Sequence, residues 1–147
     1  MTDRRKLARR KERLAQVREQ EANVLLSLAD RAVRDKETEI QQAIDTHEQS
    51  EQAFFAQEGD PAGAWMEVLE RSRNRHRNQL EVFQKELEGL KKKAEEKRLN
   101  HRQTLEALRS SEKVTEKVVA SWKKEQLVKE AKELDEVAGN QRRNREP

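Results

Sequence analysis

The sequence contains no cysteine and no tyrosine, and it has only four glycines and two prolines among its 147 residues. Without cysteine, the chain can form no disulfide, no thiolate metal site and no cysteine nucleophile. Because glycine and proline are the main breakers of regular structure, their scarcity argues against a linker-rich chain. Long uninterrupted elements are therefore expected.

Apolar residues are scarce as well. Only 33% of the residues are hydrophobic and 41% are charged, whereas a compact domain is about half apolar and about a quarter charged. Such a chain is either disordered or a long coiled coil, in which each helix buries one narrow stripe. Good helix formers dominate and the apolar residues recur periodically, so we expect an almost wholly α-helical protein.

No apolar run approaches the roughly 18 to 20 residues that are needed to cross a bilayer. The first six residues, Met-Thr-Asp-Arg-Arg-Lys, are not followed by the apolar core of a signal peptide. We therefore expect no membrane insertion and a cytoplasmic location.

One cluster of helix breakers divides the chain, at residues 59–63 with the sequence Gly-Asp-Pro-Ala-Gly. Asp60 suits a helix N-cap and Pro61 the first helical position. The sequence predicts a helix over about 3–57, a turn over 58–63, a helix over about 61–139 that ends at Gly139, and a frayed tail over 140–147. Because a short turn makes two long helices antiparallel, we expect one all-α domain, a monomeric antiparallel coiled-coil hairpin with the longer helix second.

Periodicity predicts which residues each helix turns toward the other, a stripe that we call the seam. In the first helix the spacings are mostly seven, three or four residues, with one spacing of five between Leu28 and Val33; the positions are Leu7, Leu14, Val17, Val24, Leu28, Val33, Ile40, Ile44 and Phe54. In the second helix steps of three and four alternate; the positions are Leu80, Phe83, Leu87, Leu90, Ala94, Lys97, His101, Leu105, Leu108, Ser111, Thr115, Val118 and Trp122. A fold-back near Asp60 brings Ile44 to the region of His76 and Leu7 to Lys113 and Val114.

The charges are distributed unevenly. Residues 35–60 carry a net charge of −7 and would face the bases Arg71, Arg73, Arg75 and Arg77. Residues 1–18 carry a net charge of +6, and Arg142, Arg143 and Arg145 add three bases at the other terminus. Complementary charges beside a seam help to set the orientation of the helices.

About twenty residues of the longer second helix would extend past the N-terminus of the first. This segment has an amphipathic pattern and no partner within the chain, through Trp122, Leu127, Val128, Ala131, Leu134, Val137 and Ala138. An unpaired apolar stripe on a helix predicts a protein interface.

No motif for catalysis is present, since the sequence has no glycine-rich phosphate loop, nucleophile elbow or metal-ligand spacing. His47, His76 and His101 lie far apart in sequence, although His47 and His76 could meet across the hairpin. We therefore expect a non-enzymatic protein without metal, cofactor or small-molecule substrate. Two other classes stay open, a structural coiled-coil scaffold or tether and a nucleic-acid-binding helical protein, but the basic N-terminus lacks the interleaved aromatic residues that stack on bases.

Two segments and the expected architecture resemble the FliJ/YscO/HrpO family, the stalk component of type III secretion and flagellar export systems. One segment is Trp65-x3-Leu69-x2-Ser72-x3-His76-Arg77-x-Gln79-Leu80, and the other is Lys132-Glu133-Leu134-Asp135-Glu136-x-Ala138 before an arginine-rich tail. The helical hairpin with a longer second helix is similar to the coiled-coil part of the γ subunit of rotary ATP synthases. The chain departs from the family at Thr46 and Ser50, where aromatic residues are common.

This resemblance implies a stalk that inserts its terminal end into the pore of a hexameric secretion ATPase, at the base of the secretion apparatus. The expected ATPase contacts are Trp122, Leu127, Val128, Ala131, Leu134, Arg142 and Arg143. The resemblance also implies an export-gate membrane protein as a partner, bound through Trp65, Leu69, Ser72 and His76, and export chaperones as further partners. Packing of Trp65 in the seam is the alternative to that contact.

Overall fold

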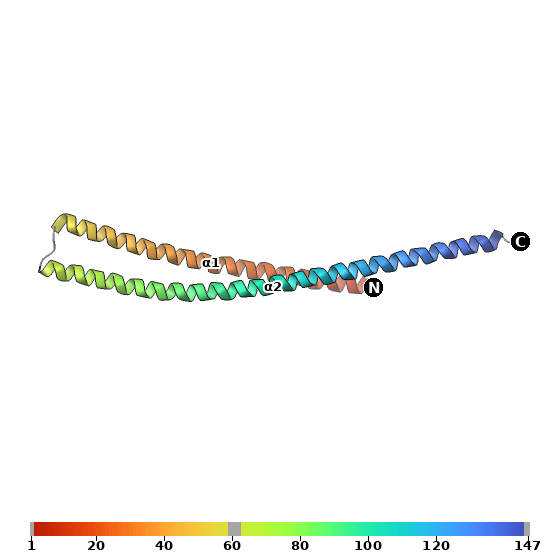
Figure 1. The fold of residues 1–147 in the computed structure, drawn as a ribbon, viewed down its shortest axis with the longest axis horizontal. Helices are drawn as coiled ribbons and strands as arrows, with labels where there is room; N and C mark the ends of the chain where they lie inside the picture. The colour runs from red at the N-terminus through yellow and green to blue at the C-terminus, as the bar shows by residue number, and fades with distance from the viewer. Residues whose placement is uncertain (1, 59–62, 146–147) are drawn as a thin grey trace. The chain divides into compact units, whose positions relative to one another are not determined.

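The structure, a computed structural model, describes residues 2–58 and 63–145. It contains two helices, α1 (Thr2–Glu58, 57 residues) and α2 (Ala64–Arg145, 82 residues) (Figure 1). The described residues are 99% helical and include no strand, and the two helices pack against each other. The prediction of an all-α hairpin with a longer second helix is confirmed.

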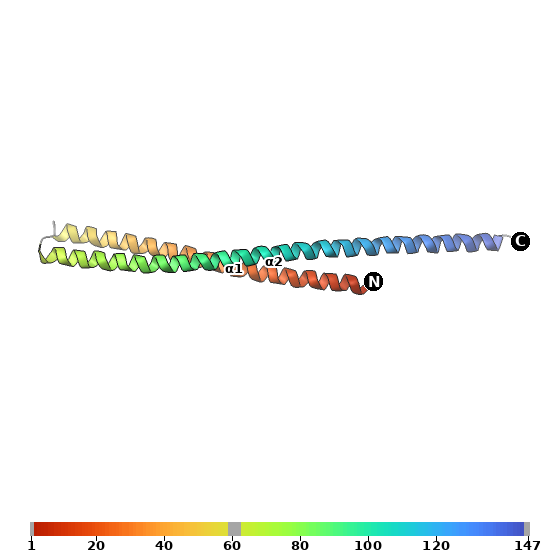
Figure 2. The same ribbon diagram turned by 60° about the horizontal axis from the view of Figure 1, so that its bottom comes forward.

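The contacts divide the chain into two compact units. Unit 1 comprises residues 1–21 and 102–147, and unit 2 comprises residues 22–101. In each unit a stretch of α1 packs against a stretch of α2 that runs in the opposite direction (Figure 2). The sequence predicted one domain and gave no sign of this division.

Gly63 is the residue immediately before α2. Its φ of +60° lies in the left-handed region, which glycine adopts without the steric cost that a Cβ would bring. Its carbonyl accepts hydrogen bonds from the backbone N–H groups of Met66 (3.1 Å) and Glu67 (3.4 Å). The predicted cap Asp60 and first helical residue Pro61 lie outside the described residues.

The predicted end of the second helix at Gly139 is wrong, because α2 continues to Arg145. A single glycine lowers helix stability by about 1 kcal/mol relative to alanine, which is too little to stop a long helix. The bases of the last turn, Arg142, Arg143 and Arg145, also interact favourably with the negative end of the helix dipole. Of the predicted frayed tail, only residues 146–147 lie outside the described part.

The predicted seam of α2 is confirmed. Leu87 and Ala94 are buried, and each of the other positions from Leu80 to Trp122 is half-buried. The alternation of three and four residues therefore located this stripe correctly, polar members included.

The predicted seam of α1 is right from Val33 onward and wrong before it. Leu7, Leu14, Val17, Val24 and Leu28 are all about half exposed. Alanines occupy every seventh position in their place, the buried Ala8, Ala15 and Ala22 and the half-buried Ala29. The half-buried residues Glu12, Glu19 and Leu26 lie between these alanines. The spacing of five residues between Leu28 and Val33 marks the point where the predicted stripe passes from the outer face of α1 to the true seam.

Alanine in the seam lets the helices approach closely, since its side chain is a single methyl group. In unit 1 the Thr115 hydroxyl on α2 donates to the Ser111 carbonyl at 3.0 Å and reaches the Ala8 carbonyl on α1 at 3.4 Å. So short a side chain can meet the backbone of the opposite helix only where the two backbones are close. A larger residue at position 8 would push them apart.

In unit 2 polar pairs fix the register. The Lys36 ammonium lies 2.6 Å from Glu86 and 4.8 Å from the centre of the Phe83 ring, and the Arg73 guanidinium lies 2.7 Å from Glu51. The second pair joins the acidic and basic segments as the charges predicted. Each exposed pair contributes no more than about 1 kcal/mol, so their role is to select an alignment.

Substitutions at positions 7 and 8 test which of these two residues lies in the seam. We expect Ala8→Leu to lower the free energy of unfolding by about 1–3 kcal/mol, because the added side chain overpacks the seam. Leu7→Ala should change it by no more than about 0.5 kcal/mol, since Leu7 is exposed and both residues favour helix. Thermal unfolding followed by circular dichroism measures both, and the reverse order of effects would show that position 7 faces α2.

Candidate protein-interaction surfaces

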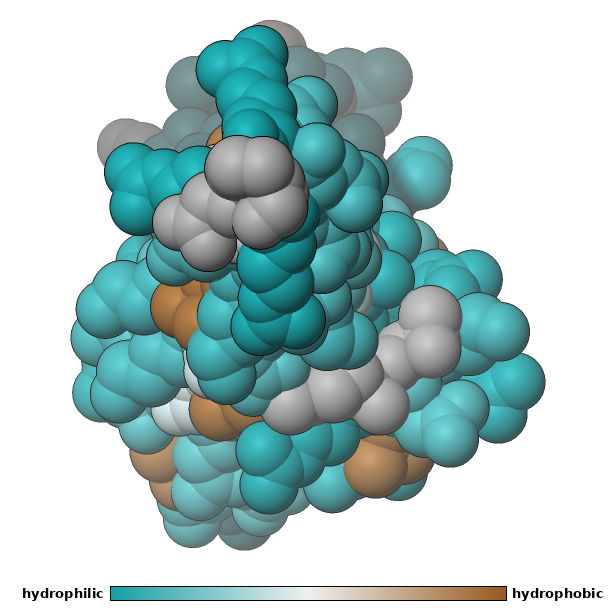
Figure 3. All heavy atoms as spheres, turned by 90° about the vertical axis from the view of Figure 1, so that its right-hand side faces the viewer, coloured by the Kyte–Doolittle hydropathy of each residue, from teal (hydrophilic) through white to brown (hydrophobic). Residues whose placement is uncertain are grey.

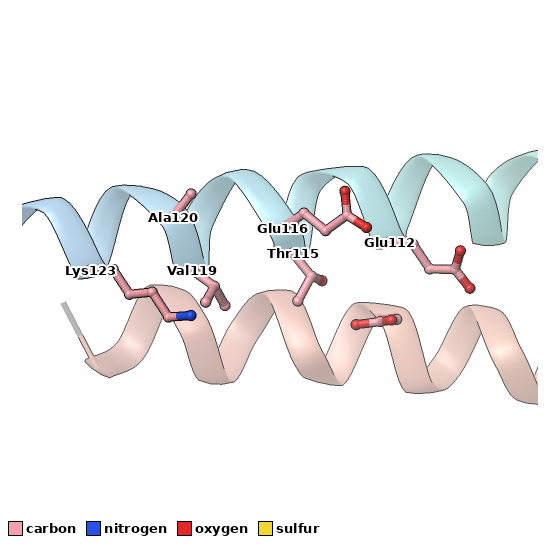
Figure 4. A pocket seen from close by; sticks show the side chains of 7 residues that line it. Glu112, Thr115, Glu116, Val119, Ala120 and Lys123 are labelled. Atoms are coloured by element: carbon pink, nitrogen blue, oxygen red, sulfur yellow. The ribbon is translucent and has the colours of Figure 1, made fainter.

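Among the described residues, no group of three or more His, Asp or Glu side chains could hold a metal ion. A groove of about 460 Å³ in unit 1 is lined mainly by α2 residues, with Thr115, Val119 and Lys123 extending toward α1 (Figure 4). The carboxylates of Glu12, Glu112 and Glu116 also line this groove.

The end of α2 presents the most exposed of the large apolar side chains of unit 1. We call residues 127–145 the α2 extension. Leu127 is 65% exposed and Leu134 is 70% exposed, and every residue from 127 to 138 is exposed. Leu127, Ala131, Leu134 and Ala138 follow one another in steps of four, three and four, so the stripe has the spacing of a coiled-coil seam.

Figure 3 views the molecule from its C-terminal side, where hydrophilic residues dominate and hydrophobic residues form separate small patches. The apolar stripe of the α2 extension is exposed along its length. The α2 extension carries the predicted contact residues Leu127, Val128, Ala131, Leu134, Arg142 and Arg143, all of them exposed.

Trp122 differs from these residues because it packs within unit 1. The Arg5 guanidinium lies 3.7 Å from the centre of the Trp122 ring, and the indole is half-buried. Cation–π contact of this kind contributes about 0.5–2 kcal/mol. Trp122 therefore closes the seam of unit 1, and the exposed stripe begins at Leu127.

At the other end of α2 the four predicted gate contacts separate into two groups. Leu69 is buried in the seam, so its side chain cannot contact a partner directly. Trp65 rests against Phe54, with ring centres 5.9 Å apart, but it remains 49% exposed. Ser72 is exposed as well, whereas His76 is half-buried.

Trp65 has exposed apolar neighbours. Met66, Val68 and Phe55 are each more than a third exposed. Val68 follows Trp65 by three residues and so lies on the same side of α2. We call Trp65 and Val68 the turn patch; of these two residues only Trp65 was predicted from the sequence.

His47 and His76 do meet across the hairpin, as the sequence suggested. Their rings are stacked, with centres 4.0 Å apart and planes inclined by 6°. The fold-back near Asp60 placed Ile44 in the region of His76, and the observed neighbour His47 lies three residues further along α1.

Charged side chains lie near the stacked histidines. His47 lies 3.0 Å from Glu51, which also accepts a hydrogen bond from Arg73. Burial and the adjacent His47 lower the pKa of His76, and Glu51 opposes that shift only in part. The hydrogen bond from Arg73 lowers the pKa of Glu51 despite partial burial. The stack therefore favours a neutral His76.

One surface was not predicted from the sequence. Leu7, Leu14 and Val17 lie on an outer face of α1 in unit 1, away from the buried alanines of the seam. The regular recurrence of alanine at every seventh position was the signal that could have revealed it.

Comparisons of the chain with protein-family models, curated proteins and solved structures find no match. Among the described residues, neither helix has a stretch apolar enough to span a membrane.

The histidine stack predicts that stability depends on pH. Because the pKa of His76 is lower in the folded state than its ordinary value of 6.5, folding is fully supported above that value and loses support as the pH falls through it. We expect the melting temperature to drop between about pH 7.5 and about pH 5.5, a range in which Glu51 stays ionised. His76→Phe keeps an aromatic ring and should flatten this dependence. An unchanged slope in the variant would assign the effect to other groups.

Proposed function

We propose that this chain is a non-enzymatic stalk of a type III protein secretion or flagellar export system. In this role the α2 extension inserts into the pore of a hexameric secretion ATPase and promotes its assembly or turnover. The chain would act in the cytoplasm at the base of the secretion apparatus. The exposed apolar stripe of the α2 extension is the observation that carries the proposal.

Its amphipathic pattern suits a protein partner. Leu127 and Leu134 lie seven residues apart on one face, with Ala131 between them, so the stripe can pack against a partner's apolar groove. A stripe of this kind in water is costly unless something covers it, and the described part of α1 does not. The resemblance in sequence at Lys132 to Ala138 falls on this segment.

Electrostatics would assist the encounter. Unit 1 contains 19 Lys and Arg residues against 13 Asp and Glu residues, a net charge of +6, whereas unit 2 has a net charge of −3. Bases occur in α1 from Arg4 to Arg13 and at Arg142 and Arg143. A concentration of positive charge accelerates association with an acidic surface, and salt screens this effect.

The turn patch supplies a second contact in this proposal. Trp65 is an exposed aromatic residue of the type that is enriched in interface hot spots, and the exposed Val68 lies beside it on the same side of α2. We assign this patch to the export-gate membrane protein. Export chaperones are further partners that the family resemblance implies.

A structural scaffold or tether is the alternative class. Such a protein needs no ATPase, and its exposed apolar stripe would bind another structural protein. Stimulation of ATP hydrolysis separates the two classes, because only a stalk acts on the ATPase.

Truncation of the α2 extension tests the proposal. We expect the full chain to stimulate ATP hydrolysis by a purified type III secretion ATPase, and we expect a chain that ends at Gln126 to lose this effect. The cut leaves Trp122 on Arg5, so helicity of the remaining chain should persist. Circular dichroism verifies the fold, and phosphate release measures the ATPase rate.

Point variants sharpen this experiment. Leu127→Glu with Leu134→Glu should abolish stimulation, whereas Leu99→Glu should not, since Leu99 is a leucine of similar exposure in unit 2. Full stimulation by the truncated chain would refute the contact through the α2 extension.

The turn patch gives a separate prediction. Trp65→Ala should weaken binding to the cytoplasmic domain of an export-gate protein by at least about tenfold, the loss of a typical hot spot. ATPase stimulation should remain, because the patch and the α2 extension share no residue. Calorimetric titration measures the affinity. A large fall in melting temperature without loss of binding would instead show that Trp65 serves the hairpin.

A further inference from the structure

In unit 1, α1 is apolar on two faces. Its seam face carries Ala8 and Ala15, which are buried against α2. Its outer face carries Leu7, Leu14 and Val17, which are 53%, 50% and 49% exposed. The larger apolar residues therefore lie on the face that α2 does not cover.

The outer residues have the spacing of a second coiled-coil seam. Leu7, Leu14 and Val17, together with Arg10, follow one another in steps of three, four and three. This alternation places all four residues along one line of an α-helix, where another helix can interdigitate with them. The occupant that the spacing fits is thus a helix rather than a strand or a loop.

The positions beside this stripe specify the charge of the occupant. In a coiled coil the residues that flank the seam meet the flanking residues of the partner helix. Here the four flanking positions are Lys6, Lys11, Arg13 and Arg18, all basic and all exposed. The one acid between Lys6 and Arg18 is Glu12, which is half-buried on the seam side.

We propose that the outer face of α1 between Lys6 and Arg18 binds an amphipathic helix of another protein, with an apolar stripe flanked by Asp and Glu. The helix packs on Leu7, Leu14 and Val17, and its carboxylates lie beside the flanking bases. A second copy of this chain fits less well. Two such faces in antiparallel contact would oppose Lys11 and Arg18 of one copy to the same residues of the other.

The apolar residues of this surface are separate from those that serve the proposed function, since Leu7, Leu14 and Val17 lie on α1 and the α2 extension lies on α2. The bases Lys6, Lys11 and Arg13 also belong to the cluster that would steer the ATPase encounter. Substitutions of the apolar residues therefore distinguish failure of one proposal from failure of the other.

A pair of synthetic peptides tests the inference on the full-length chain. Both have about three heptads with leucine at the seam positions, one with glutamate and the other with lysine at the flanking positions. We expect the glutamate-flanked peptide to bind, with an affinity that falls as salt is raised, and the lysine-flanked peptide to bind at least about tenfold more weakly. Fluorescence anisotropy of labelled peptides measures both affinities.

Variants locate the site. Leu14→Glu with Val17→Glu should reduce binding of the glutamate-flanked peptide at least about tenfold without loss of helicity, because both residues are exposed. Leu134→Glu in the α2 extension is the matched control and should bind as the unmodified chain does. Lys11→Glu with Arg18→Glu should reverse the preference between the two peptides, and this readout does not depend on the stability of the Leu14 variant.

Three results would overturn the inference. They are equal affinity for both peptides, binding that survives Leu14→Glu with Val17→Glu, and an unchanged preference after the charge reversal. Sedimentation of the free chain supplies a further test. A dimer that the Leu14 and Val17 substitutions convert to a monomer would assign this face to a second copy and reject the acidic helix.

Discussion

The regular placement of alanine along α1 is the constraint on which unit 1 depends. With Ala8 and Ala15 at the seam, α2 comes close enough for the Thr115 hydroxyl to reach a backbone carbonyl of α1. A seam of methyl groups buries little apolar area, so close contact and correct register have to supply much of the stability. The larger residues Leu7 and Leu14 cannot enter such a seam and remain on the outer face.

Whether the large apolar residues of a helix lie in its seam also explains which parts of the seam could be predicted from the sequence. In α2 most of the large apolar residues between Leu80 and Trp122 are seam residues, so their spacing identified the whole stripe, including the polar His101 and Thr115. In the first half of α1 most of the large apolar residues lie outside the seam, with the half-buried Leu26 as an exception, so their spacing indicated the wrong face. The spacing of five before Val33 was the physical sign of the error, because five residues turn a helix by about 500°, well off the direction of the stripe.

The candidate surfaces were predictable to different degrees. An exposed stripe beyond the N-terminus of α1 follows from unequal helix lengths, and Leu127 and Leu134 lie where that reasoning put them. The contacts of single residues depend on register, which periodicity does not fix to better than about one turn. For that reason Trp122 and Leu69, assigned to partners from the sequence, belong to the seam. Gly139 shows a similar limit, since its local preference is outweighed by the helix formers on both sides.

In unit 1 the small and the large apolar residues of α1 lie on different faces and differ in what they can contact. The seam residues Ala8 and Ala15 are small, whereas Leu7, Leu14 and Val17 on the outer face are about half exposed. In the proposed complex, a helix that covers the outer face of α1 would add apolar burial that the seam lacks. By binding the folded state, it would stabilise that state by mass action. Placing leucine at the alanine positions to stabilise the seam would displace α2 and remove the geometry that presents the outer face.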